Sequence, residues 1–223
     1  MNLAASILKC LVLILYNRFV EVRIIMANET ENVFLLKKTE NINDLESCLE
    51  DGYEKRTGFN EKTTLNNDTR LLIVGSAVPP DISYFYTGRF SYMYKWIDEV
   101  RETKLRRLQD NINLTRDSEK KEKYVEEIRK ILYEQRIAFL DIAHSFITKI
   151  GSRSDSHIKK YFFNRDDFKC LYDNKDITII AVTPNAKSAL ERFLGFKNIQ
   201  CIPIFCKSGW NKNDIIDVLE STK

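Results

Sequence analysis

The feature that most constrains this chain is a short apolar run that stops abruptly at small residues. Residues 71–74 read LLIV, a run of strand-forming residues, and Gly75-Ser76-Ala77 follow at once. Two prolines and a cluster of aromatic residues come next, before a helical pattern begins near residue 92. A buried strand that opens into a shaped loop is how an α/β domain builds a pocket at the carboxyl end of a strand. We therefore expect the functional site at this loop.

Apolar runs and helical patterns alternate along the rest of the chain. The strand-like runs are 71–74, 137–140, 177–182 and 199–205, and the helical patterns are 92–108, 119–135, 184–194 and 211–219. Such alternation predicts parallel strands joined by right-handed crossovers, with helices on both faces of the sheet. The expected fold class is α/β, a three-layer α/β/α sandwich around a short, mostly parallel four-stranded sheet. Residues 141–150 are apolar on nearly every side, and we expect them to form a buried helix that follows the strand at 137–140.

Thr183-Pro184 predicts the start of the helix over 184–194. Threonine is a favoured N-cap residue, and proline is favoured at the first helical position. Gly195 then stands where a helix commonly ends.

We expect residues 70–223 to form this domain and residues 1–69 to be an N-terminal extension. The first sixteen residues are mostly apolar, with Asn2, Ser6 and Lys9 as exceptions, but a membrane-spanning helix needs roughly 20 apolar residues. Residues 1–25 therefore read as a signal-like segment, as a segment that packs on the domain, or as the result of a misplaced start with translation beginning at Met26. We favour the last two readings, and so expect no membrane attachment and an intracellular, cytoplasmic or nucleoid-associated, location.

The composition excludes several classes of site. The five cysteines include no CxxC pair, and the two histidines lie far from any cysteine pair, which argues against a zinc centre. Gly75 lacks the further glycines of a GxGxxG motif, and no GKS or GKT occurs, which argues against a dinucleotide site or a P-loop. We therefore expect neither a metal nor a cofactor. The net charge of +3 permits a polyanionic partner without demanding one.

Three segments of the chain form a recognisable series. The first is LLIVGSAVPP with the aromatic segment SYFYTGRFSYMYKW, the second is IAFLDIAHSFITKIGSRSDSHI, and the third is DITIIAVTPNAKSALERFLG with IQCIPIFCKSG. In this order they resemble the uracil-DNA glycosylase superfamily, most closely its hypoxanthine/uracil-type branch. The resemblance spans most of residues 70–210. It implies a monomeric protein that acts on DNA and hydrolyses the N-glycosidic bond of uracil or hypoxanthine without a metal or cofactor.

The resemblance also implies a base pocket. Its walls would be the backbone of Gly75, Ser76 and Ala77, and Phe85 or Tyr86 would stack on a base extruded from the DNA. The other reading of these residues is that the small ones are small for packing and the aromatic ones fill the core.

The catalytic and DNA-contacting residues follow from the same resemblance. The family's catalytic Asn falls on Ser91, and Asp81 or Asp141 would then position the attacking water. Arg89 and Lys207 would contact phosphates, and Ser208 and Trp210 lie in the loop that would enter the DNA, with Trp210 as an apolar wedge. The other readings are that Arg89 forms a surface salt bridge and that Trp210 packs under the last helix.

The sequence leaves two histidines and two other functions open. We expect His144 to be a core histidine on the helix over 141–150, and His157, beside Asp155 in a loop, is ambiguous. Because Ser91 replaces the family's Asn, a catalytically inactive member that binds nucleic acid or a nucleobase-like ligand is an alternative. A protein-interaction scaffold is a third possibility.

Overall fold

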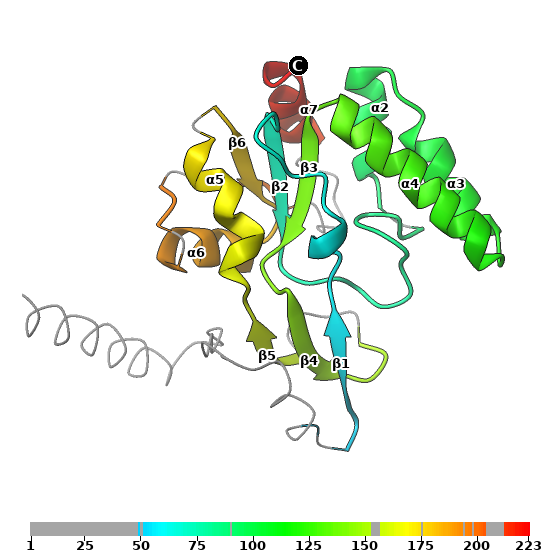
Figure 1. Ribbon diagram of the computed structural model, residues 1–223, viewed down its shortest axis with the longest axis vertical. Coiled ribbons are helices and arrows are strands. Elements are labelled where there is room, and N and C mark those ends of the chain that lie inside the picture. Colours follow the sequence, from blue (N-terminus) through cyan, green and yellow to red (C-terminus); the bar gives the residue numbers. More distant parts are fainter. Residues whose placement is uncertain are drawn as a thin grey trace, which may run out of the picture. The chain divides into compact units, whose positions relative to one another are not determined.

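The computed structural model describes residues 49, 51–89, 91–152, 157–174, 176–193, 195–197, 199–203 and 212–223 (Figure 1). The strands are β1 (Tyr53–Thr57), β2 (Leu71–Gly75), β3 (Ile137–Asp141), β4 (Ser145–Lys149), β5 (Ile158–Phe162), β6 (Thr178–Ala181) and β7 (Gln200–Cys201). The α-helices are α2 (Met93–Arg101), α3 (Leu105–Leu114), α4 (Ser118–Glu134), α5 (Lys169–Asp173), α6 (Pro184–Phe193) and α7 (Lys212–Ser221). Two short 3-10 helices are η2 (Asn60–Lys62) and η4 (Arg165–Phe168).

The predicted parallel sheet is present, in the order β3-β2-β6-β7. β2 pairs in parallel with β3 on one side and with β6 on the other, and β7 adds in parallel to β6. Every residue of β2 is buried. A central parallel strand is covered on both faces, which is why residues 71–74 are uniformly apolar rather than alternating. The α/β fold class with a parallel sheet is confirmed.

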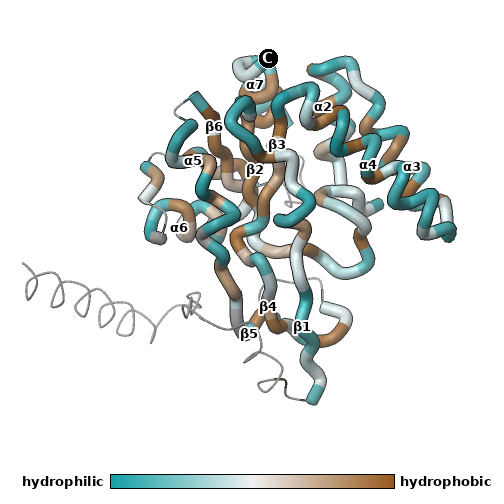
Figure 2. The backbone as a smooth tube through the Cα atoms, viewed as in Figure 1, coloured by the Kyte–Doolittle hydropathy of each residue, from teal (hydrophilic) through white to brown (hydrophobic). Residues whose placement is uncertain are grey.

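Alternate residues of β2 face two different core clusters. Leu71 and Ile73 pack in a cluster with residues of α2, α3, α4 and α7, whereas Leu72 and Val74 pack with residues of α5 and α6. Figure 2 shows the hydrophobic band that runs along β2, β3 and β6 between these helices. Since side chains alternate along a strand, one strand supplies both clusters. The carboxyl ends of the strands are thereby held in fixed positions.

A second sheet, antiparallel and in the order β1-β4-β5, was not predicted. Residues 145–149 form its central strand, so the prediction of a helix over 141–150 is wrong. The chain leaves β3 still extended, because Ile142 N–H donates to the Gly75 carbonyl at 2.9 Å and Ala143 N–H donates to the Ser76 carbonyl at 3.0 Å. β4 is then buried between two partner strands. Burial on every side is compatible with either a helix or a central strand, and here long-range pairing decides between them.

Residues 53–69, which we grouped with the N-terminal extension, are hydrogen-bonded to the rest of the fold. β1 pairs along its whole length with β4. The hydroxyls of Thr63 and Thr64 donate to the β3 carbonyls of Phe139 and Ile137, at 2.7 and 2.8 Å. This segment therefore packs against both sheets. Residues 1–48 lie outside the described part of the chain.

Apart from the segment 141–150, the helical predictions differ from the structure at one place. The charged pattern at 119–135 is α4, as predicted, but the pattern at 92–108 is divided between α2 and α3. The break falls at Glu102, whose φ of 54° is left-handed, and the Asp98 carboxylate then accepts from the N–H groups of Leu105 and Arg106 at the start of α3. Among the helices described, none has the length and apolar character needed to cross a membrane.

Candidate functional site

A cavity of about 920 Å³ lies at the carboxyl ends of the parallel strands. One side is formed by the loop that follows β2, by the first turn of α2 and by Asp141 at the end of β3. Thr183, at the end of β6, contributes with the start of α6. The opposite side comes from the antiparallel sheet, through Arg56, Phe146, Thr148 and Ile158. The expectation of a pocket at the β2 exit therefore agrees with the geometry.

Nine of the residues named from the sequence line this cavity. They are Gly75, Ser76, Ala77, Asp81, Phe85, Tyr86, Arg89, Ser91 and Asp141. The other three, Lys207, Ser208 and Trp210, lie outside the described residues. The nine lining residues come from segments as far apart in the chain as Gly75 and Asp141, which are separated by 66 positions. Their presence at the cavity does not by itself assign a role to any of them.

Gly75 makes room for a buried carboxylate. The parallel register pairs Gly75 with Asp141, and a Cβ placed on Gly75 would overlap Oδ1 of Asp141 and lie 3.5 Å from the hydroxyl oxygen of Tyr86. Asp141 is only 6% exposed. A side chain at position 75 would therefore displace the Asp141 carboxylate from the place where it meets the cavity.

Tyr86 keeps its proton and adopts an uncommon backbone conformation. Burial, and then the neighbouring charge of Asp141, raise the pKa of the Tyr86 phenol well above its usual value. The phenol is thus a neutral O–H that can donate a hydrogen bond. Its φ of 55° lies in the left-handed region, which is strained for a bulky side chain. Strain of this kind tends to cluster at functional sites.

A polar network behind the cavity holds the backbone of Asp141. The Asn60 side chain accepts from Asp141 N–H at 2.9 Å and donates to its carbonyl at 2.8 Å. Asn60 also donates to Asp167 at 2.7 Å, and Asn164 Nδ2 donates to the other oxygen of Asp167 at 3.0 Å. Asn60 is 4% exposed, so its amide is committed to this network. The end of β3 is therefore fixed by side chains as well as by the sheet.

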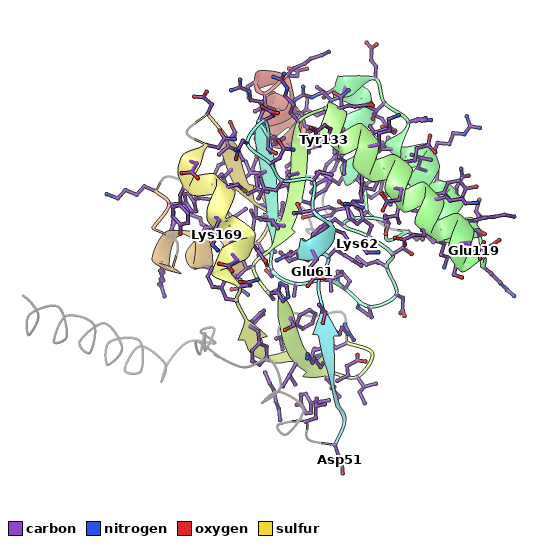
Figure 3. The ribbon with its side chains drawn as sticks, viewed as in Figure 1. Asp51, Glu61, Lys62, Glu119, Tyr133 and Lys169 are labelled. Atoms are coloured by element: carbon purple, nitrogen blue, oxygen red, sulfur yellow. The ribbon has the colours of Figure 1, made fainter. Side chains whose placement is uncertain are left out.

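His144 belongs to the same network and not to a helix. It lies between β3 and β4, and its Nδ1 is 3.0 Å from Oδ2 of Asp167. Its Nε2 is 3.9 Å from Glu61, which lies on η2 next to Lys62 (Figure 3). Its side chain is only 13% exposed and is hydrogen-bonded, as expected of a core histidine, but the prediction that it lies on a helix is wrong because the segment is extended. His157 lies elsewhere, with Nδ1 2.8 Å from the Ser152 hydroxyl.

Ser76 joins the ends of two strands. Its hydroxyl is hydrogen-bonded to the Thr183 hydroxyl, and Thr183 Oγ1 also accepts from Ala186 N–H at 3.0 Å. The predicted N-cap of α6 is thereby confirmed. The small residues at the β2 exit thus allow a direct contact between β2 and the α6 cap, beside the cavity.

The remaining predicted residues differ in exposure. Phe85 is 3% exposed and packs edge-on against Phe59 and Tyr84, with ring centroids 5.7 and 5.1 Å apart, so most of its surface serves the core. The Ser91 carbonyl accepts from Arg106 at 3.0 Å and from Gln109 at 3.1 Å, which holds the start of α2 in place. Asp81 and Arg89 are exposed at the cavity.

Arg56 is a cavity residue that sequence reasoning missed. Its side chain is 12% exposed, it is ion-paired with Glu54, and its Nη1 donates to the Ser152 carbonyl at 2.8 Å. Hydrogen bonding to Arg56 is the main cause that lowers the pKa of the Glu54 carboxyl. No local signal marked this residue, because β1 reaches the cavity only through its pairing with β4.

Two further aromatic residues line the cavity, Tyr92 and Trp96. Their rings stack with centroids 6.3 Å apart and an interplanar angle of 21°. Their i,i+4 spacing at the start of a helical pattern was the available signal. Within the described ranges, no group of three or more His, Cys, Asp or Glu side chains is arranged to hold a metal ion.

The fold resembles a solved structure. The chain is similar to the solution NMR structure of a putative uracil DNA glycosylase from Methanosarcina acetivorans, with 21% sequence identity and a TM-score of 0.54. The similarity covers 76% of this chain and 99% of the other. The two chains share a fold. No protein-family profile matches the sequence, and neither does any curated protein.

This likeness confirms the predicted uracil-DNA glycosylase-like fold at the level of architecture. The branch of the superfamily and the divergence of the catalytic residues stay predictions. The shared fold also does not assign an activity, since one fold hosts many functions and function depends on the site.

Proposed function

We propose that this protein hydrolyses the N-glycosidic bond of a deaminated base, uracil or hypoxanthine, in DNA. The observation that carries the proposal is the buried Asp141 carboxylate, which Gly75 admits to the wall of a 920 Å³ cavity. The proposed frame is a three-layer α/β/α domain of the uracil-DNA glycosylase type. The proposed partner is DNA, bound by a monomeric, intracellular protein, cytoplasmic or nucleoid-associated.

The proposed reaction begins when the target base leaves the base stack and enters the cavity. The C1′–N bond breaks, the bonding electrons leave with the base, and the sugar acquires oxocarbenium character. Asp141 holds the attacking water and takes its proton as the oxygen bonds to C1′. The neutral Tyr86 hydroxyl and the N–H groups of Ser76 and Ala77 are suitable donors to the negative charge on the departing base.

Of the two candidate carboxylates, Asp141 suits this role better. Asp141 is almost fully buried, so little solvent screens the attraction between its charge and a developing cation. Asp81, in contrast, is exposed at the cavity. Ser91 stands where the related family has its Asn, and its hydroxyl is the proposed second contact to the water. Phe85 or Tyr86 remains the proposed aromatic wall of the base pocket, and Arg89, Lys207, Ser208 and Trp210 remain the proposed DNA contacts.

The test is a strand-cleavage assay on single-stranded and duplex oligonucleotides that carry uracil or hypoxanthine, with alkali to reveal abasic sites. We expect product from the wild type and a loss of roughly hundredfold or more in rate for Asp141→Asn. Asp176→Asn is the matched control, because Asp176 is an exposed aspartate that pairs with Arg70 at 3.4 Å and does not line the cavity. Asp81→Ala, run in parallel, separates the two carboxylates. Full activity of Asp141→Asn would contradict the assigned role.

The replacement of the family's Asn by Ser91 supports one alternative, a protein that binds the same DNA without cleaving it. In that case no product forms, while binding to the oligonucleotides weakens as salt rises. The absence of both product and binding would exclude both functions.

A further inference from the structure

One aromatic residue at the cavity remains largely exposed. Tyr92 lines the cavity, yet 58% of its surface is accessible, whereas Phe85 is 3% exposed and Trp96 is 8% exposed. Trp96 covers one side of the Tyr92 ring in a stacked geometry. The exposed part of the Tyr92 ring is therefore open to a further flat partner.

The backbone that carries Tyr92 is held firmly. Tyr92 is the N-cap residue of α2, and its carbonyl accepts from Trp96 N–H at 3.1 Å. The preceding carbonyl, of Ser91, accepts two side-chain hydrogen bonds, and the next two residues, Met93 and Tyr94, are buried in the core. A rigid aromatic ring loses little conformational freedom when it stacks on a ligand.

A cation lies close by in the chain. Just before Tyr92, Ser91 N–H donates to the Gly88 carbonyl at 2.9 Å. Arg89, between these two residues in the chain, is exposed and also lines the cavity. An exposed aromatic ring beside a positive charge is the combination that binds single-stranded nucleic acid, since bases stack on the ring and the cation contacts a phosphate.

The cavity also has room for more than one base. Its volume of about 920 Å³ is near the upper end of the 300–1,000 Å³ typical of sites for drug-sized ligands. Uracil is a single six-membered ring. A neighbouring nucleotide can therefore remain at the site while the target base occupies it.

We propose that Tyr92, supported by Trp96, is a stacking platform for the unpaired base next to the target base, and that the protein binds single-stranded DNA in preference to duplex. In a duplex the neighbouring base is paired and stacked between its own neighbours, so its face is not available to Tyr92. This inference rests on the proposed function, because it takes the cavity as the binding site of the target base. Arg89 contacts the phosphate between the two nucleotides.

The experiment measures binding separately from cleavage. Fluorescence anisotropy follows a labelled single strand that carries a cleavage-resistant fluorinated analogue of deoxyuridine. Two further strands lack one neighbouring base, on the 5′ or the 3′ side, but keep its sugar and phosphate. The same labelled strand annealed to its complement gives the duplex.

Tyr92→Ala should weaken binding of the complete single strand roughly tenfold, and Tyr92→Phe should bind like the wild type. The effect of Tyr92→Ala should disappear on one of the two strands that lack a neighbouring base, since the partner of the ring is then absent. The wild type should bind the duplex more weakly than the single strand.

Tyr172→Ala is the matched control. Tyr172 is 54% exposed and stacks on Phe196 with centroids 5.6 Å apart and an angle of 22°, but neither ring lines the cavity. Its replacement should leave binding unchanged. Circular dichroism of each variant verifies that the fold is retained.

Three results would overturn the inference. They are unchanged binding by Tyr92→Ala, a loss that persists equally on both strands with a missing neighbour, and the absence of wild-type binding to any strand. Cleavage of ordinary uracil DNA is assayed in parallel. Binding that depends on Tyr92 without cleavage would refute the proposed hydrolysis alone, whereas cleavage with binding independent of Tyr92 would refute the platform alone.

Discussion

Gly75 and Asp141 face each other across two paired strands, and the absence of a side chain at one position allows the carboxylate at the other. The sequence identified Gly75 as the end of a strand, but it offered no reason for a glycine rather than an alanine. That reason is the contact between Gly75 and Asp141, residues 66 positions apart, which exists only in the folded chain.

Gly75→Ala should therefore reduce activity much more than stability. The new methyl group meets the far end of the Asp141 side chain, which can swing aside, so we expect a loss of about 1 kcal/mol in the free energy of unfolding. The displaced carboxylate should reduce the cleavage rate roughly hundredfold. Urea unfolding and single-turnover cleavage measure the two effects.

Gly88→Ala serves as the control for this change. Gly88 lies in the same loop and lines the same cavity, but its Cβ would meet only a methyl group of Ile82, at 3.3 Å. We expect near-normal cleavage from this variant. Equal activity of Gly75→Ala and wild type would mean that Asp141 does not need its present position.

At the scale of elements, the start of α6 was predicted correctly, whereas the helix predicted over residues 141–150 was wrong. Thr183-Pro184 carries a local signal, because capping is a contact between a side chain and a backbone amide three residues away. Residues 141–150 carry no such signal. Residues 145–149 form a strand because they pair with β1 and β5, and β1 lies about 90 residues earlier in the chain.

Thr183→Ala should lower the free energy of unfolding by about 1–2 kcal/mol, because α6 loses its cap and the Ser76 hydroxyl loses its partner. Thr183→Ser keeps both hydrogen-bonding groups and should cost less than about 0.5 kcal/mol. Urea denaturation of the two variants and the wild type tests this. An equal loss in both variants would indicate that the threonine methyl group, not the hydroxyl, matters.

At the scale of the whole molecule, the two sheets meet at the chain segment after β3. The network of Asn60, Asp167 and His144 lies at this junction. Through it Asn60 is hydrogen-bonded to Asp141, 81 residues later in the chain, and to Asp167, 107 residues later. The cavity opens at the same junction, with walls from both sheets. Fold stability and site geometry are therefore coupled through these side chains.

Asn60→Leu should cost about 3 kcal/mol of unfolding free energy, since it removes the buried hydrogen bonds that the Asn60 amide makes with the N–H and carbonyl of Asp141. It should also slow cleavage under conditions in which the variant is still folded, because the end of β3 is released. Chemical denaturation and cleavage at low temperature measure both effects. Asn67→Leu, at an exposed position in the same region of sequence, should change neither. A loss below about 1 kcal/mol in Asn60→Leu would mean that water replaces the amide.

Local sequence was sufficient to predict the buried strands, the loop at Gly75, helix α4 and the cap of α6, because each depends on contacts within a few residues or on the period of apolar side chains. The strand exit at Gly75 indicated where the pocket lies, and the family resemblance named the nine residues that line this cavity. The second sheet, the place of His144 and the position of Arg56 at the cavity became visible only in the folded chain. The folded chain also showed that, of the two candidate carboxylates, Asp141 is buried and Asp81 is exposed. These features depend on pairing between distant segments, which leaves no local pattern to read.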